Sequence, residues 1–194
     1  MKSVVLLGSI LLLSACGSMQ SQVVKKNVAF DPDSQAQIRS YGSYGSDLIR
    51  IYPETDCAKW EGTKRNAVNR RFVNGLPRKV RNISIGIPPT ELSRKTEKDT
   101  GFVFRDSYRE MVVSANQPVV LDGAFSSQTR NQHYSCRVAA SFTPKAGEAY
   151  EVRYLSEEKG CDIEVYHIGH EEKDGVRQTK KLTANYCAKP GTSF

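Results

Sequence analysis

The sequence predicts an all-β fold, most simply an antiparallel β-sandwich of about eight strands. Short stretches in which every second residue is apolar recur along the chain, as in strands that bury one face. Turn residues such as Gly, Pro, Asn and Asp separate these stretches. No segment shows an equally clear helical period. A small barrel is the alternative arrangement for strands spaced in this way.

The alternation places the strands near residues 47–53, 79–87, 109–115, 118–125, 134–142, 148–156, 161–168 and 178–187. Alternate residues of a strand point to the same face, so Ile83, Ile85 and Ile87 can line a core. Packed together, the strands predict a sandwich of immunoglobulin-like or transthyretin-like form. Residues 58–77 fit this scheme least, with a short and poor helix near 64–73, and residues 88–107 are predicted to form a long charged loop.

The first residues have the features of a secretory signal. Lys2 precedes an apolar run over residues 4–13, which is too short to span a bilayer as a helix. Leu13-Ser14-Ala15-Cys16 then resembles the lipobox of bacterial lipoproteins, and this resemblance implies cleavage before Cys16 and its lipidation. The alternative is an ordinary cleaved signal with a chance cysteine.

This interpretation divides the chain into a signal peptide (1–15), a lipidated Cys16 with a flexible tether (16–45) and a single β-sandwich domain (46–194). Acylated Cys16 would bind membrane lipid, since several acyl chains anchor a protein durably. Gly17 and Ser18 follow Cys16, where lipoproteins retained in the inner membrane commonly carry Asp. We therefore expect a Gram-negative outer-membrane protein that faces the periplasm.

Once Cys16 is assigned to lipid, the four other cysteines form an even set, Cys57, Cys136, Cys161 and Cys187. An exported chain meets an oxidising compartment, so we expect two disulfides. If the strand at 178–187 pairs with the one at 161–168 so that Ile168 lies opposite Lys180, then Cys161 lies opposite Cys187. The predicted bridges are Cys161 with Cys187 and, by elimination, Cys57 with Cys136.

Positive charge is concentrated in one part of a chain whose formal net charge is +7. Residues 59–98 contain eleven Lys and Arg against three Glu. Such a segment predicts a face that binds an anionic component, and the alternative is a solvated face that keeps the protein soluble. Lipopolysaccharide, peptidoglycan or an envelope protein are the candidate partners, and nucleic acid is not expected in that compartment. The predicted binding residues are Arg65, Arg70, Arg71, Arg78, Lys79 and Arg81.

Catalytic patterns in the sequence are weak. Asp99-Thr100-Gly101 matches the aspartic-protease triplet, but the chain carries only one copy where that chemistry needs two carboxylates. His167 and His170 would point to opposite faces of a strand unless the chain turns at Gly169. We expect no catalytic residue, no cofactor and no metal, with an envelope hydrolase that uses Asp99, His167 or His170 as the alternative.

Several short motifs resemble those of small proteobacterial envelope lipoproteins. The resemblance covers most of residues 47–168 and rests on Ile51-Tyr52-Pro53 before Cys57, Ile85-Gly86-Ile87-Pro88, residues 115–119, and Cys136 leading to residues 142–147 and 150–152. It implies an all-β lipoprotein and brings no catalytic residues with it. The expected function is therefore non-catalytic binding at the outer membrane. A lysozyme inhibitor is a further alternative, by analogy of size, disulfides and anchoring alone.

Overall fold

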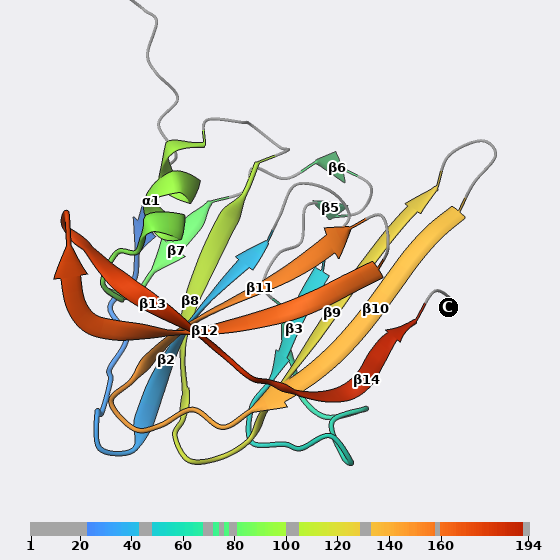
Figure 1. The fold of residues 1–194 in the computed structure, drawn as a ribbon, viewed down its shortest axis with the longest axis horizontal. Coiled ribbons are helices and arrows are strands. Elements are labelled where there is room, and N and C mark those ends of the chain that lie inside the picture. The colour runs from blue at the N-terminus through green and yellow to red at the C-terminus, as the bar shows by residue number, and fades with distance from the viewer. Residues whose placement is uncertain are drawn as a thin grey trace, which may run out of the picture.

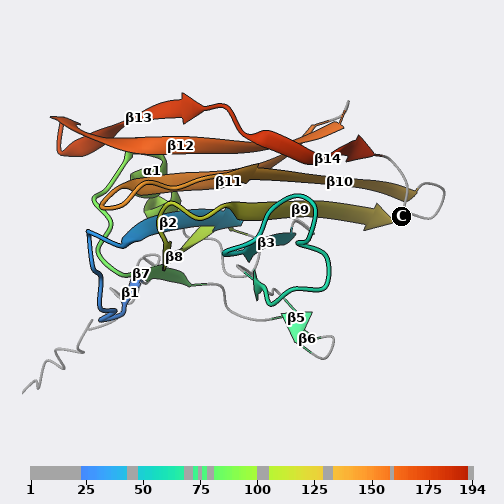
Figure 2. The same cartoon turned by 90° about the horizontal axis from the view of Figure 1, so that it is seen from below.

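Two β-sheets pack face to face in the computed structural model and form an all-β sandwich (Figure 1, Figure 2). The residues that the structure describes are 23–42, 48–67, 72–73, 76–77, 81–99, 105–128, 133–157 and 160–191. The predicted fold class is confirmed.

The larger sheet has seven strands. In spatial order they are β1 (Val23–Lys25), β7 (Asn82–Ser84), β8 (Ser107–Ser114), β2 (Gln35–Gly42), β11 (Ala149–Glu157), β12 (Gly160–Lys173) and β13 (Val176–Leu182). The pairs β1–β7, β7–β8 and β2–β11 are parallel, and the other pairs are antiparallel.

The second sheet has five strands, in the order β14 (Asn185–Gly191), β10 (His133–Phe142), β9 (Val119–Gln128), β3 (Leu48–Tyr52) and β4 (Asn66–Ala67). A separate two-stranded pair consists of β5 (Phe72–Val73) and β6 (Leu76–Pro77). The described residues of segment 64–73 thus include β4 and β5, and not the short, poor helix expected there.

The core lies between the sheets and follows from the alternation in the strands. Val152 and Val165 face it from the larger sheet and Leu121 and Val138 from the smaller one, and all four are fully buried. Packing is close enough that a Cβ added to Gly123 would lie 2.2 Å from the ring of Tyr154. Of the three isoleucines predicted to line the core, Ile83 and Ile85 are only partly buried and Ile87 is buried; β7 ends at Ser84, so the three do not share one strand face.

The predicted strands are present, with one correction at the end of the chain. The segment 178–187 is two strands, because β13 ends at Leu182 and the chain crosses to the other sheet as β14. In addition, Ile168 lies opposite Thr179 and not opposite Lys180.

This crossing explains why the predicted disulfide pairing is wrong. All four cysteines form disulfides, as expected, but the bridges are Cys57–Cys187 and Cys136–Cys161. Cys187 has left the sheet that holds Cys161, so the two are not cross-strand neighbours. Cys136–Cys161 joins the two sheets through the core, whereas Cys57–Cys187 fastens β14 to the segment that follows β3.

The predicted tether over residues 16–45 is wrong where strands β1 and β2 form, at residues 23–25 and 35–42. Strand β2 occupies a central position between β8 and β11, and its Ala36 and Ile38 are fully buried in the core. The outward residues of β2 are polar, which made the segment resemble a linker. Cys16 and the proposed signal peptide lie outside the described residues.

A helix replaces part of the predicted loop at 88–107. Helix α1 (Glu91–Lys98) begins at Thr90, whose side chain accepts a hydrogen bond from Ser93 N while Ser93 Oγ accepts one from Thr90 N. This reciprocal cap satisfies backbone donors that a helix start would otherwise leave free. Glu91 in the first turn and Lys95 and Lys98 in the last suit the helix dipole.

Candidate functional site

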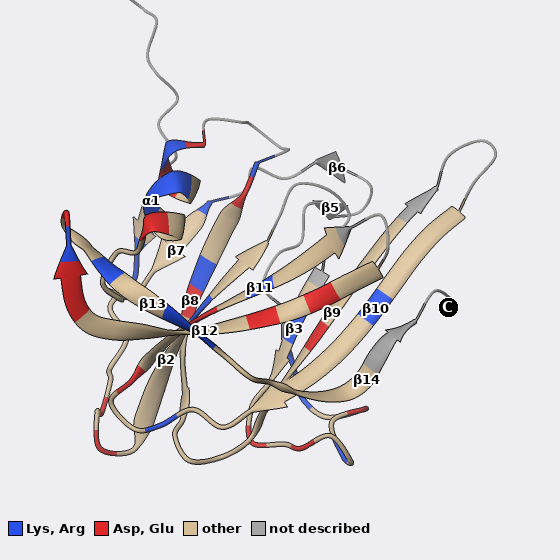
Figure 3. Ribbon diagram, viewed as in Figure 1, with Lys and Arg blue, Asp and Glu red and all other residues tan. Residues whose placement is uncertain are grey.

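The outer face of the seven-stranded sheet carries a row of polar residues that lie directly opposite one another. Across β8, β2, β11, β12 and β13 the row reads Glu110, Arg39, Glu151, Tyr166 and Lys181. Directly opposed residues share one face of a sheet, so all five point away from the core. Figure 3 shows charged bands along β8, β12 and β13 and charged residues of both signs on helix α1. The first three residues of the row alternate in charge, so this face of the sheet is polar and not apolar.

The row has a covered half, Glu110, Arg39 and Glu151, over which α1 and the turn before it lie. Arg39 is at its centre. Its Nε donates to Glu110 Oε1 at 2.9 Å and its Nη1 to Glu151 Oε1 at 3.0 Å. Its Nη2 donates to the carbonyl oxygens of Ile87 and Pro88. Burial alone would lower the pKa of Arg39, but the neighbouring acidic groups raise it, so the guanidinium stays charged although the residue is 1 % exposed.

Glu110 uses its second oxygen to hold a turn. Oε2 accepts hydrogen bonds from the backbone N–H groups of Ile85, Gly86 and Ile87 at 2.7, 3.1 and 3.2 Å. Gly86 has φ of +107°, a conformation that favours glycine. This carboxylate therefore fixes the turn that leads through Pro88 to the start of α1.

Glu151 links the sheet to the helix. Its Oε1 accepts from Arg39, from the hydroxyl of Tyr41 and from the hydroxyl of Thr90. Burial raises the pKa of Tyr41, and the nearby charge of Glu151 raises it further, so this hydroxyl remains a donor. Because Thr90 is also the N-cap of α1, the position of the helix depends on Glu151.

The open half comprises Tyr166 and Lys181 of the row together with the neighbouring cross-strand pair on the same face, Arg153 and Glu164. Glu164 accepts hydrogen bonds from Arg153 and Lys181 at 2.5 and 2.6 Å and from Tyr166 at 2.9 Å. Burial would raise the pKa of Glu164, but these hydrogen bonds outweigh it and lower the pKa. The guanidinium of Arg153 lies 5.0 Å from the centre of the Tyr166 ring. These contacts fix Arg153 and Tyr166 in place.

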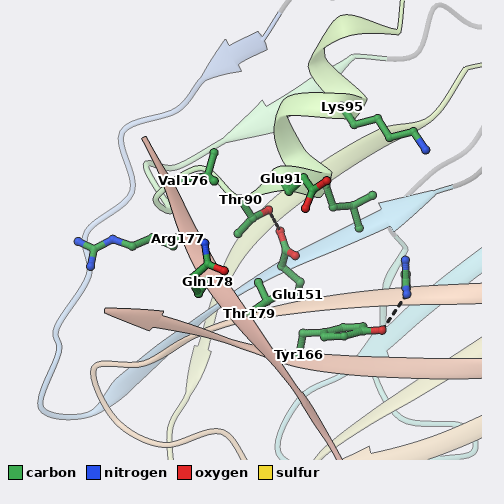
Figure 4. Close-up of a pocket in the computed structure, with 11 residues that line it drawn as sticks. Thr90, Glu91, Lys95, Glu151, Tyr166, Val176, Arg177, Gln178 and Thr179 are labelled. Carbon is green, nitrogen blue, oxygen red and sulfur yellow. Dashed lines mark hydrogen bonds between the residues drawn. The ribbon is translucent and has the colours of Figure 1, made fainter. Parts of the chain in front are cut away.

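A pocket lies where the covered half meets the open half (Figure 4). It has a volume of about 340 Å³ and is bordered by the start of α1 and by β11, β12 and β13. Its charged lining residues are Glu91, Lys95, Glu151, Arg153 and Arg177. The remaining lining residues are Thr90, Leu92, Tyr166, Val176, Gln178 and Thr179. A mostly polar pocket with both signs of charge suits a small polar ligand.

The predicted basic residues are only partly accounted for. Arg65 and Arg81 are exposed, whereas Arg70, Arg71, Arg78 and Lys79 lie outside the described residues. The end of the same basic stretch forms α1, where Arg94, Lys95 and Lys98 are exposed. Of these, Lys95 lines the pocket.

Asp99, His167 and His170 do not line the pocket. Asp99 is the C-cap of α1, and its Oδ2 accepts a hydrogen bond from Asp106 N. His167 and His170 lie on β12, where an irregularity in pairing after Ile168 brings both near Glu148 Oε2, at 2.6 and 3.8 Å. The hydrogen bond from His167 lowers the pKa of Glu148. In the part of the chain that the structure describes, no three His, Cys, Asp or Glu residues are arranged to hold a metal ion.

Sequence reasoning did not find the central residues of this site, namely Glu151, Arg153 and Tyr166 on the hairpin and Thr90 at the helix start. One local signal was available for Thr90, since Pro-Pro-Thr-Glu is a helix-start pattern with an acidic first turn. For Glu151 the only signal was a charged residue between buried Tyr150 and Val152.

Comparisons of the chain with protein-family models, with curated proteins and with solved structures find no match. Within the described ranges, no helix combines the length and apolar character needed to cross a lipid bilayer.

Proposed function

We propose that this chain is an outer-membrane lipoprotein, anchored through Cys16, whose periplasmic β-sandwich binds an anionic envelope component without catalysing a reaction. The observation that carries the proposal is the pocket between α1 and the β11–β13 strands, where Lys95, Arg153 and Arg177 line one small cavity. Lipopolysaccharide and peptidoglycan are the candidate components, because both present anionic groups to a periplasmic protein.

Preorganisation of the pocket supports binding as its role. Arg153 is held by Glu164 and Tyr166, and Glu151 is held by Arg39, Tyr41 and Thr90. Side chains that are already fixed lose little entropy when a ligand arrives, so less of the interaction energy is spent on ordering them. The lipobox at Cys16 and the two disulfides agree with an exported, anchored protein.

The hydrolase alternative has less support from the geometry, because its candidate residues lie outside the pocket. The lysozyme-inhibitor alternative stays a prediction for which the described residues offer no specific observation.

Binding can be tested with the full-length lipidated protein in detergent, incubated with purified peptidoglycan sacculi or with immobilised lipopolysaccharide. We expect capture by at least one polymer, and a loss of roughly tenfold or more when Lys95→Gln and Arg177→Gln are combined. Lys145→Gln with Lys173→Gln is the matched control, since both lysines are exposed and neither lines the pocket.

A third pair, Arg65→Gln with Arg81→Gln, separates the pocket from the basic stretch predicted from sequence. A loss confined to this pair would move the binding face away from the pocket. No capture of either polymer by the wild-type protein would contradict the proposed function.

The proposed lipid anchor at Cys16 is tested separately. Cys16→Ser should release the protein from the membrane fraction or leave it unprocessed. If a fatty-acid analogue supplied to cells did not label the wild-type protein, the lipoprotein part of the proposal would be wrong.

A further inference from the structure

We infer that the pocket selects a ligand that carries a primary ammonium group close to an anionic group. This inference rests on the proposed function and deepens it, because it names the chemistry that the bound envelope component must present. It comes from a buried carboxylate at the floor of the pocket and from the cations around it (Figure 4).

One carboxylate oxygen of Glu151, Oε2, accepts no hydrogen bond from the described residues. Its side chain is 4 % exposed, and all three of its donors, Arg39, Tyr41 and Thr90, bond to Oε1. Within the described residues no hydrogen bond reaches Oε2, although the residue lines the pocket. Oε2 opens into the pocket, so a ligand that brings an N–H or O–H donor replaces water there and gains a charge-assisted hydrogen bond.

Charge favours an ammonium group over a hydroxyl. In the covered half of the row, Glu110 and Glu151 share Arg39 as their ion-pair partner. Tyr41 and Thr90 add hydrogen bonds to Glu151 but no charge. A positively charged donor at Oε2 would therefore also compensate the excess negative charge of this buried cluster.

The anionic part of the ligand has its partners at the edge of the same pocket. Lys95 is exposed on α1 and takes part in no ion pair among the described residues, which leaves its ammonium group available. Arg177 is the second residue of β13; its guanidinium donates a hydrogen bond to the carbonyl oxygen of His170, and its ion-pair contact with Glu172 is long, at 3.9 Å. Figure 4 shows Lys95 and Arg177 on opposite sides of Glu151 with their end groups pointing away from it, so each would turn inward to meet the anionic group of a ligand seated on Glu151.

Two components of bacterial envelopes offer this chemistry. A phosphoethanolamine headgroup carries an ammonium two carbons from a phosphate, and the diamino acid of a peptidoglycan peptide carries an ammonium next to a carboxylate. The probes are therefore phosphoethanolamine and meso-diaminopimelate, each titrated into the full-length protein by calorimetry at low salt.

Each probe has a counterpart that lacks the primary ammonium group. Phosphocholine keeps both charges of phosphoethanolamine but has no N–H group, and N-acetylation of both amines converts the ammonium groups of diaminopimelate into neutral amides. We expect at least one of the two probes to bind, and its counterpart to bind roughly tenfold to a hundredfold more weakly. Glu151→Gln should weaken binding of the same probe by a similar factor, whereas Arg94→Gln, on the same helix but outside the pocket, should not.

The outcomes separate this inference from the function on which it rests. Binding of phosphoethanolamine alone identifies a headgroup as the source, and binding of diaminopimelate alone identifies a peptide. Equal binding of each probe and its counterpart without a primary ammonium group overturns the inference, and this comparison needs no variant to fold. Capture of an envelope polymer that depends on Lys95 and Arg177, without binding of either probe, overturns the inference and leaves the proposed function standing.

Discussion

The two halves of the charged row have the same kind of residues in different surroundings. In the covered half, the side chains of Glu110, Arg39 and Glu151 are at most 4 % exposed. In the open half, those of Arg153 and Lys181 are 33 % and 55 % exposed. The difference arises because α1 and the turn before it cover one half, and both are held in place by the carboxylates that they bury. Burial, and not the identity of the charges, should therefore decide what each ion pair contributes.

The largest effect is expected for Arg39→Met. Removing the guanidinium leaves two buried carboxylates without their shared cation, which should lower the free energy of unfolding by about 3–5 kcal/mol. Denaturation in urea with the disulfides intact measures the loss. Arg153→Met is the counterpart in the open half and should cost about 1 kcal/mol or less. Equal losses in the two variants would mean that the cover does not strengthen the row.

The next largest effect is expected for Glu110→Gln. The amide cannot accept as many hydrogen bonds as the carboxylate does from Ile85, Gly86 and Ile87, so stability should fall by about 2–3 kcal/mol. Hydrogen exchange should show faster exchange at these three amides. The core amide of Val165 serves as the control, after correction for the change in global stability. Unchanged protection at all three would show that the turn does not depend on Glu110.

At acid pH the ion pairs of the open half should lose their contribution to the stability of the protein. The folded-state pKa of Glu164 lies below its ordinary value of 4.5, so its contribution to stability is complete above that value. That contribution is lost as the pH falls through the lowered folded-state pKa, since protonation removes the acceptor for Arg153 and Lys181. The stability difference between wild type and Glu164→Gln should therefore shrink when unfolding is compared at about pH 6 and about pH 3. A difference that stayed constant would contradict this assignment.

The smallest effect is expected for Lys181→Gln, because water and salt screen an ion pair at an exposed position. The variant should lose less stability than Glu164→Gln at low ionic strength, and the loss should vanish at high ionic strength. A loss that persists in high salt would indicate that Lys181 is better shielded than its exposure implies.

The hairpin of β11 and β12 could be predicted from sequence because its pattern is local. Tyr150, Val152 and Tyr154 alternate before the turn and Ile163 and Val165 after it, and the structure pairs Val152 with Val165. The strand at the end of the chain was predicted in one piece because β13 and β14 are separated by only two residues. Nothing in that short break indicates a change of sheet. The predicted disulfide pairing is wrong for the same reason.

The covered charges could not be predicted in the same way. Arg39, Glu110 and Glu151 come from three distant parts of the chain and meet through the pairing of β8, β2 and β11. A charged residue inside a strand usually indicates an exposed face. Here that face is covered by a helix whose own sequence is polar, so neither partner carries the apolar stripe by which buried surfaces are recognised.

If Cys16 carries lipid as proposed, the early start of β1 limits how far the domain can move from the membrane. Only six residues, 17–22, lie between Cys16 and Val23, the first residue of β1. Even fully extended, the seven residue steps from Cys16 to Val23 span roughly 25 Å. The domain would then be confined to a thin layer beside the bilayer, where the local concentration of headgroups is high and modest affinity suffices for occupancy. A pocket held this close to the bilayer would first be occupied by zwitterionic headgroups of the membrane surface itself.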